Sequence, residues 1–215
     1  MRVLIACEES QAVCKAFREL GHEAYSCDLQ DCSGGHPEWH IKADALELLK
    51  LRWDLIIAHP PCTYLAASSA VCLFNKDHSV KDAERYRKGE AARDFFMEFI
   101  NSDAAPMIAV ENPAPLKCFQ LPPYSQIIEP YMFGDPWRKR TCLWLKNLPT
   151  LMATDIVVPE GLWVGSSSFR SHPGNKQKYK LTSNRNQKTR AKTFPGIARA
   201  MAEQWGGAMR MEEIA

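Results

Sequence analysis

The sequence lacks several features that would each define a class of protein. None of its apolar runs approaches the roughly 20 residues that cross a bilayer, since the longest, such as residues 3–7, are far shorter. The chain reaches Glu8 and Glu9 too soon to hold a signal peptide. It also shows no internal repeat. With neither targeting signal, we predict a cytoplasmic protein that has no membrane partner.

Paired-cysteine motifs are missing as well, although the chain has eight cysteines. No Cys-x-x-Cys occurs, which argues against a zinc ribbon and a thioredoxin motif, so we expect no metal. A chain of 215 residues can bury a core without covalent crosslinks. We therefore expect most of the cysteines to be reduced and partly buried.

Acidic residues are absent from one long stretch. Residues 161–202 contain nine Lys or Arg and no Asp or Glu, which leaves 18 basic against 25 acidic residues elsewhere. A basic segment on an acidic body favours a polyanionic partner, and a solvated loop is the alternative. The candidate nucleic-acid-binding residues are Arg170, Lys176, Lys178, Lys180, Arg185, Lys188 and Arg190.

What the chain does contain is an alternation of strand-like and helix-like segments. Short apolar runs predict strands at 3–7, 23–27, 53–58, 107–110 and 141–145. Amphipathic stretches predict helices at 12–20, 44–51, 81–100 and 195–205. We place Ser10 at the N-cap of the first helix and Ala91, Phe95 and Phe99 on the apolar face of the long one. Such alternation implies an α/β fold, with a mostly parallel sheet covered by helices on both faces.

The alternation divides the chain into three parts. Residues 1–145 form the predicted catalytic and cofactor-binding core, and residues 193–215 a C-terminal helix that packs back on it. Between them, residues 146–192 are rich in Pro, Gly, Ser, Asn, Lys and Arg, which predicts a basic, loop-like insertion. We expect the chain to be a monomer.

Polar residues cluster at the predicted carboxyl ends of the strands, where ligands bind in an open parallel sheet. Asp28 ends the second strand about 20 residues after the first turn, where a carboxylate can accept hydrogen bonds from a ribose diol. A plain surface carboxylate fits the same spacing. Asp44 is a weaker case of the same kind.

The turn after the first strand, Cys7-Glu8-Glu9-Ser10, contains no glycine. Without glycine, Cβ atoms project toward a ligand, and two carboxylates disfavour a pyrophosphate. A cationic ligand that bears an amino group and a sulfonium is compatible with them. The turn therefore argues against NAD and ATP and favours S-adenosylmethionine.

Cys62 is the candidate nucleophile. Pro60 and Pro61 fix the backbone directly after a buried strand and hold the thiol at the sheet edge, where a thiolate can be activated. A proline-terminated strand followed by a buried cysteine is the alternative. Glu111 follows the next strand, and a carboxylate beside such a cysteine can donate a proton to a ring nitrogen of a bound base.

Two arginines, Arg138 and Arg140, precede the predicted strand 141–145 and are able to hold a base carbonyl and the neighbouring backbone. Together these residues resemble the DNA cytosine-C5 methyltransferases. The shared motifs occur in the family's order: 3–10, Asp28, Asp44, Pro60-Pro61-Cys62, Glu111-Asn112, Arg138-x-Arg140 and a final helix near 194–205. The resemblance covers most of residues 1–145 and, more loosely, 190–206. It implies a Rossmann-like, S-adenosylmethionine-dependent methyltransferase fold and methyl transfer to C5 of cytosine in DNA.

The resemblance also implies a role for each matching residue. Cys62 attacks C6 of the pyrimidine, Glu111 protonates N3 or hydrogen-bonds to it, and Arg140 holds O2 with help from Arg138. Asn112 belongs to the same catalytic set. The implied cofactor-binding residues are Ala6, Cys7, Glu8, Ser10, Asp28, Asp44 and Pro60. In duplex DNA the target base must also be flipped out of the stack.

The chain departs from the family's pattern in several places. His59 stands where a small residue is usual, and Pro136 replaces a glutamine. The region available for target recognition, residues 146–192, is short. These departures leave three alternatives open: a single-stranded substrate, a free pyrimidine nucleotide, and a non-catalytic relative that binds nucleic acid.

Overall fold

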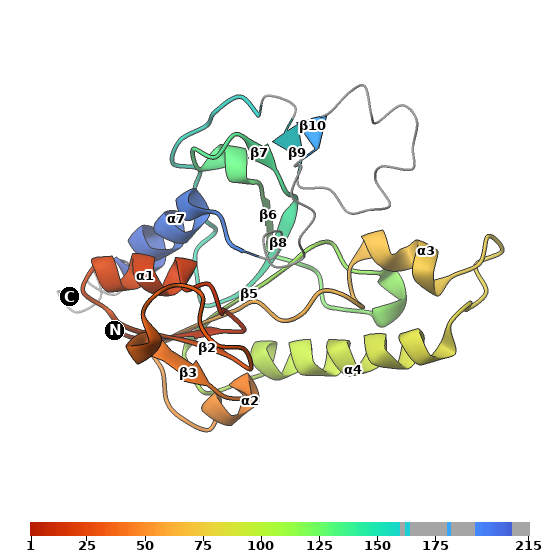
Figure 1. The fold of residues 1–215 in the computed structure, drawn as a ribbon, viewed down its shortest axis with the longest axis horizontal. Helices are drawn as coiled ribbons and strands as arrows, with labels where there is room; N and C mark the ends of the chain where they lie inside the picture. The colour runs from red at the N-terminus through yellow and green to blue at the C-terminus, as the bar shows by residue number, and fades with distance from the viewer. Residues whose placement is uncertain (160–161, 164–179, 182–191, 208–215) are drawn as a thin grey trace.

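The computed structural model describes residues 1–159, 162–163, 180–181 and 192–207 (Figure 1). Its centre is a seven-stranded sheet in the order β3-β2-β1-β4-β5-β8-β6. Its strands are β1 (Arg2–Ala6), β2 (Glu23–Asp28), β3 (His40–Lys42), β4 (Leu55–Ala58), β5 (Met107–Asn112), β6 (Gln126–Ile128) and β8 (Thr141–Lys146). β3, β2, β1, β4 and β5 run parallel, whereas β8 is antiparallel to β5 and to β6. The predicted α/β class with a mostly parallel sheet is therefore confirmed.

Helices cover both faces of this sheet (Figure 1). The α-helices are α1 (Ala12–Glu19), α2 (Ala45–Leu48), α3 (Ala70–Leu73), α4 (Ala83–Ile100) and α7 (Pro195–Gly206). Short 3₁₀ helices lie at Pro37–Trp39, Ala67–Ser69, Lys117–Phe119 and Pro130–Met132. α1 and α7 pack together on one face, where Phe17 and Trp205 are fully buried. α2 and α4 cover the other face, to which α4 contributes Phe96 and Phe99.

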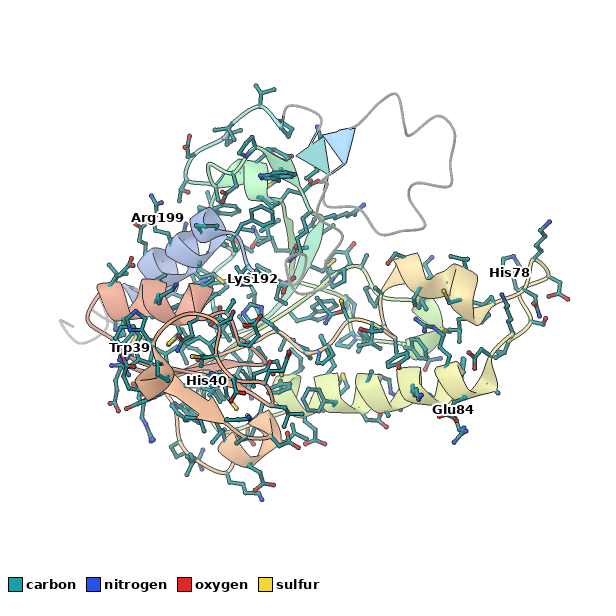
Figure 2. All side chains as sticks on the ribbon, in the orientation of Figure 1. Trp39, His40, His78, Glu84, Lys192 and Arg199 are labelled. Atoms are coloured by element: carbon teal, nitrogen blue, oxygen red, sulfur yellow. The ribbon has the colours of Figure 1, made fainter. Side chains whose placement is uncertain are left out.

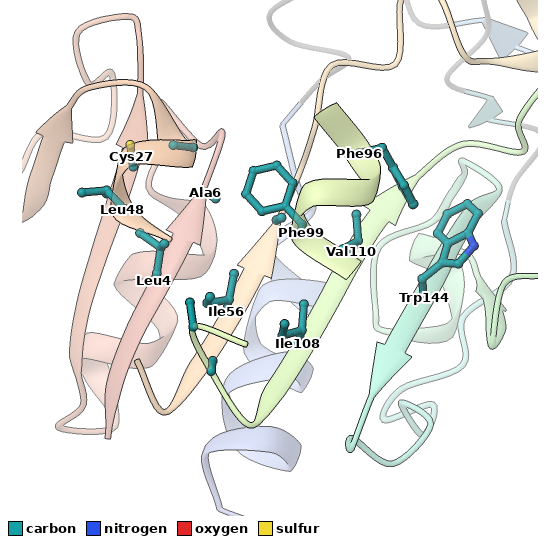
Figure 3. Close-up of a cluster of buried hydrophobic side chains, with 14 of the residues drawn as sticks. Leu4, Ala6, Cys27, Leu48, Ile56, Phe96, Phe99, Ile108, Val110 and Trp144 are labelled. Carbon is teal, nitrogen blue, oxygen red and sulfur yellow. The ribbon is translucent and has the colours of Figure 1, made fainter. Parts of the chain in front are cut away.

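The two cores are filled by alternate residues of the same strands. In β1, Leu4 faces the α4 side, and Val3 and Ile5 face the α1 side. Figure 3 shows Ile56 and Ile108 packed beside Phe99 in the first of these cores. Because both faces are buried, the central strands read as unbroken apolar runs rather than as alternating ones, which explains why the sequence located them.

The start of α1 differs from the prediction. The N-cap is Gln11, which makes no side-chain cap, and Ser10 lies outside the helix. The buried carboxylate of Glu8 takes over this function, because its two oxygens accept hydrogen bonds from the backbone N–H groups of Val13 at 2.7 Å and Cys14 at 3.2 Å. Glu8 lies in the turn before the N-cap residue Gln11, outside the position at which a capping side chain is normally expected.

The long helix also differs in detail from the prediction. It begins at Ala83 rather than at residue 81, since Asp82 caps it by accepting from Arg85 N at 2.9 Å. Phe99 is buried as predicted, together with Phe96, whereas Phe95 is only half-buried and Ala91 is exposed.

A second, small sheet joins the end of the core to the basic segment. It consists of β7 (Trp137–Arg138), β9 (Leu162–Trp163) and β10 (Lys180–Leu181), in the order β10-β9-β7. All three strands are parallel. The segment from 146 to 192 therefore pairs through β9 with the chain just before β8.

Candidate active site

Four neighbouring strands end at one level of the large sheet. The register pairs Ala6 with both Cys27 and Ala58, and Ala58 with Val110. Because β2, β1, β4 and β5 are parallel, the residues that come next lie in a row at the edge where ligands bind. In the order of the strands across the sheet, these residues are Asp28, Cys7, His59 and Glu111.

His59 and Glu111 are in direct contact in this row. Nδ1 of the imidazole lies 3.1 Å from Oε2 of Glu111, and the two side chains are 10% and 14% exposed. The backbone N–H of His59 donates to the carbonyl of Ala6 at 2.9 Å, which fixes the imidazole beside β1. The other ring nitrogen, Nε2, is buried and has no hydrogen-bond partner among the described residues.

The environment of Glu111 favours its ionised form. Burial raises the pKa of Glu111, but the hydrogen bond to His59 and the charge of Lys139 outweigh it, so the pKa lies below its ordinary value. A carboxylate in this state accepts hydrogen bonds and has no proton of its own to donate. Protonation of a base by Glu111 therefore requires a proton from a neighbouring group.

Hydrogen bonds tie the loop that carries Cys62 to the loop after β5. Nδ2 of Asn112, a side chain that is only 1% exposed, donates to the carbonyl of Pro60 at 2.8 Å. Further along, the backbone N–H of Leu116 donates to the carbonyl of Leu65 at 2.7 Å. Cys62 itself is exposed, so the alternative of a buried cysteine is wrong. The loop of Cys62 and the strand that carries Glu111 are thus held together.

The three basic residues before β8 face two different carboxylates. Burial raises the pKa of Glu129, and the charges of Arg138 and Arg140 oppose this rise. Lys139 acts instead on Glu111. This division follows from extended backbone, in which alternate side chains point to opposite sides. Lys139 is a candidate site residue that the Arg-x-Arg motif does not include. The alternation of side chains along this segment is the sequence feature that could have identified it.

The turn between β1 and α1 adopts a backbone that glycine usually favours. Cys7 has φ of 60° and Gln11 has φ of 57°, both in the left-handed region. The strain is held by the surroundings, because Glu8 caps α1 from within. Gln11 adds a second restraint, since its side-chain amide accepts from His36 N at 3.1 Å and donates to His36 O at 2.8 Å.

The acidic residues predicted to hold a cofactor converge on this turn. Burial raises the pKa of the Cys7 thiol, and the nearby Asp28, Cys27 and Asp44 raise it further. Asp28 and Asp44 each also accept a hydrogen bond from a backbone N–H two residues on. Oε2 of Glu9 is buried and has no hydrogen-bond partner among the described residues. The turn therefore presents negative charge and one unsatisfied acceptor.

The remaining predicted cofactor residues lie around the same turn. Ala6 and Pro60 are buried, and Ser10 is half-buried. The predicted nucleic-acid-binding residues Arg170, Lys176, Lys178, Arg185, Lys188 and Arg190 lie outside the described residues, as does the side chain of Lys180. Lys192, which opens the last described segment, donates to Ser33 Oγ at 3.3 Å (Figure 2).

The part of the chain that the structure describes contains neither a metal-binding cluster nor a membrane-spanning helix. No group of three or more His, Cys, Asp or Glu side chains there is arranged to hold a metal ion. Within the same ranges, no helix is long and apolar enough to traverse a bilayer. No disulfide joins the eight cysteines.

Comparisons with known proteins identify no family for this chain. No protein-family model matches the chain, and no curated protein matches it. Among solved structures, it is similar to that of a mutant of DNMT2 from Spodoptera frugiperda, with 15% sequence identity and a TM-score of 0.38. The match covers 73% of this chain and 54% of that one, so the chain spans about half the length of that protein. At this level of similarity, the functional conclusion rests on the geometry of the site.

Proposed function

We propose that the chain is an S-adenosylmethionine-dependent methyltransferase that acts on C5 of cytosine in DNA through a covalent bond between Cys62 and C6. The observation that carries the proposal is the hydrogen bond from Asn112 to the Pro60 carbonyl, 2.8 Å long. This hydrogen bond links the loop after β4, which carries the exposed Cys62 thiol, to the end of β5, which carries Glu111. A nucleophile and a carboxylate held at the ligand-binding edge are the groups that this chemistry needs.

The turn after β1 fits a cationic cofactor. Glu9 has a buried carboxylate oxygen without a hydrogen-bond partner among the described residues, and Cys7 and Gln11 give the turn the backbone of a glycine-containing loop. Asp28 ends β2 and Asp44 follows the adjacent strand β3, and both can accept hydrogen bonds from a ribose or an amino group. When bound, S-adenosylmethionine supplies an electrophilic methyl group on its sulfonium. Glu8 is engaged with α1, so Glu9 is the carboxylate available to this cation.

The residues of the chain make C5 of the base reactive. An aromatic C5 is a poor nucleophile, so the Cys62 thiolate first forms an Sγ–C6 bond while N3 takes a proton through Glu111. The ring is then an enamine whose C5 can accept the methyl group. The C5 proton afterwards leaves to a base, the Sγ–C6 bond breaks, and the ring regains its aromaticity.

The composition of residues 161–202 supports DNA as the substrate. Nine Lys and Arg without one Asp or Glu suit a ligand that presents several phosphates. A polymer binder loses affinity steeply as salt increases, whereas a mononucleotide binder loses little. Binding of DNA measured at several salt concentrations therefore separates the proposed substrate from a free nucleotide.

A trapping experiment tests the covalent step. The full chain is incubated with S-adenosylmethionine and with duplex DNA, single-stranded DNA or a mononucleotide, each carrying 5-fluorocytosine. Fluorine cannot leave C5 as a cation, so a productive complex remains bonded to Cys62 and appears as an added mass in the intact protein. We expect the adduct with DNA.

Two cysteine variants make the result specific. Cys62→Ala should form no adduct, whereas Cys72→Ala, which removes another exposed thiol, should form it at the wild-type rate. Absence of an adduct with every substrate, while S-adenosylmethionine binds, would contradict the covalent mechanism. An adduct with the mononucleotide alone would leave the chemistry intact and change the substrate.

A further inference from the structure

His59 occupies a position that the proposed mechanism leaves without a task. Its Nδ1 is 3.1 Å from Oε2 of Glu111, and its Nε2 is buried without a hydrogen-bond partner among the described residues. One ring nitrogen of His59 therefore contacts the carboxylate of Glu111, and the other ring nitrogen is able to carry a proton. Imidazole is the side chain that exchanges a proton between about pH 5 and 8.

Charged groups surround this imidazole on several elements. Glu8, at the end of β1, lies close enough for the charge of His59 to lower the pKa of Glu8 against the rise caused by burial. On the other side stands Glu111, whose pKa is lowered by His59 and by Lys139. Arg140 and Glu111 both act on the Cys142 thiol of the neighbouring β8. Two glutamates, Glu8 and Glu111, thus lie near His59 on either side, and the cation Lys139 acts on only one of them.

The proposed substrate needs that proton. N3 of cytosine has no hydrogen and is an acceptor, so addition of a thiolate to C6 leaves negative charge on the ring unless N3 is protonated. Glu111 is held in its ionised form and has no proton to give. If His59 is protonated, the hydrogen-bonded pair of His59 and Glu111 holds the missing proton. One transfer along that hydrogen bond brings the proton to Glu111, which contacts the cytosine.

We propose that His59 is a positioning residue that stores the proton which Glu111 delivers to N3 of cytosine. The inference rests on the proposed function and adds the source of its proton. As the Sγ–C6 bond forms, the proton on Nδ1 of His59 passes to Oε2 of Glu111, and Glu111 gives a proton to N3. When the Sγ–C6 bond breaks, the proton returns from N3 to Glu111 and then to His59. The methyl group comes from the sulfonium of S-adenosylmethionine, and the C5 proton leaves to solvent.

The test is the pH dependence of adduct formation with 5-fluorocytosine DNA, followed by intact mass between pH 5 and 9. Wild type should give a bell, because the rate rises as the Cys62 thiol ionises and falls as the His59–Glu111 pair loses its proton. His59→Asn places an amide N–H near the position of Nδ1 and keeps the hydrogen bond to Glu111, but it cannot titrate. Its rate at pH 7 should fall by about 10²-fold, and the decline at high pH should disappear.

Two controls keep the outcomes distinct. His78→Asn changes an exposed histidine in the loop between α3 and α4 (Figure 2), at a left-handed position that asparagine tolerates, and it should keep the bell. Thermal unfolding checks that each variant folds, and His59→Gln replaces His59→Asn if that variant does not. A wild type without any adduct overturns the proposed function. A wild-type bell that survives unchanged in the folded His59 variant overturns the role of His59 alone.

Discussion

The ends of β1 and β5 each carry a buried carboxylate near His59, and the two behave in opposite ways. Burial raises the pKa of Glu8, and neither the charge of His59 nor the N–H groups of Val13 and Cys14 fully offset this rise. Burial raises the pKa of Glu111 too, but His59 and Lys139 reverse its direction. The environment therefore favours the neutral form of Glu8 and the ionised form of Glu111, although both glutamates lie near His59.

The difference shows that partners, rather than burial, decide what a buried carboxylate does. Glu8 accepts only backbone N–H groups of one helix, so it serves the fold. Glu111 contacts a titratable side chain and lies next to the loop of Cys62, so it serves the proposed chemistry. If this distinction holds, variants at the ends of β1 and β5 should differ in activity and in the pH dependence of stability.

The largest expected effect is on turnover. Glu111→Gln removes the group that passes a proton to N3, so methyl transfer should fall by about 10²–10⁴-fold. Glu8→Gln acts only through the turn that it supports, and its loss should stay below about tenfold. Steady-state assays of both variants at saturating S-adenosylmethionine measure this. Equal losses in the two variants would mean that the ends of β1 and β5 do not differ in function.

A second, smaller effect concerns the anchor of the nucleophile loop. Asn112→Ala removes the hydrogen bond to Pro60 and should slow adduct formation by about 10–10²-fold, because a displaced nucleophile loses its alignment. It should also lower the free energy of unfolding by about 1–3 kcal/mol. Gln126→Ala is the matched control, since that amide likewise bonds backbone groups, at Leu151, but lies on β6. It should lower stability while leaving the adduct rate near that of wild type.

The smallest effect is the pH dependence of stability, measured by denaturant unfolding from pH 3 to pH 8. The pKa of Glu111 is lowered on folding, so its contribution is present above the ordinary carboxyl pKa and is lost as pH falls through its folded value. The raised pKa of Glu8 works the other way, since its contribution is present at low pH and is lost as pH rises.

Glu111→Gln should therefore lose stability relative to wild type as pH rises, whereas Glu8→Gln should gain it. The slope of each difference is at most about 1.4 kcal/mol per pH unit for one proton. Two slopes of the same sign would show that the environments of Glu8 and Glu111 are alike.

Much of the fold follows from local pattern. β1, β4 and β5 lie within two residues of their predicted bounds, because strands buried on both faces are continuous apolar runs. β3 and β6, with three residues each, and β7, with two, have no such run and were not predicted. The sequence also could not predict that β8 is antiparallel to β5, because side-chain periodicity is the same in parallel and antiparallel strands.

Less of the site follows from pattern. Residues at strand ends, such as Cys62 and Glu111, are found because parallel topology brings such ends together. The contact of His59 with Glu111 joins residues 52 positions apart, and no local rule relates them. Glu8 was predicted to bind a cofactor, yet its side chain points into the start of α1, which depends on the left-handed turn at Cys7 and Gln11.

The sequence by itself determined which chemical groups stand at the sheet edge: a thiol after Pro60-Pro61, a carboxylate before Asn112 and an acidic turn without glycine. It determined them because strands buried on both faces are continuous apolar runs, and ligands bind at the carboxyl ends of parallel strands. Only the tertiary structure decided the partners of these groups and the direction in which the pKa of Glu111 shifts. A pKa depends on charges, dipoles and solvent within a few ångströms, and the neighbours of Glu111, His59 and Lys139, reach it from two other segments of the chain.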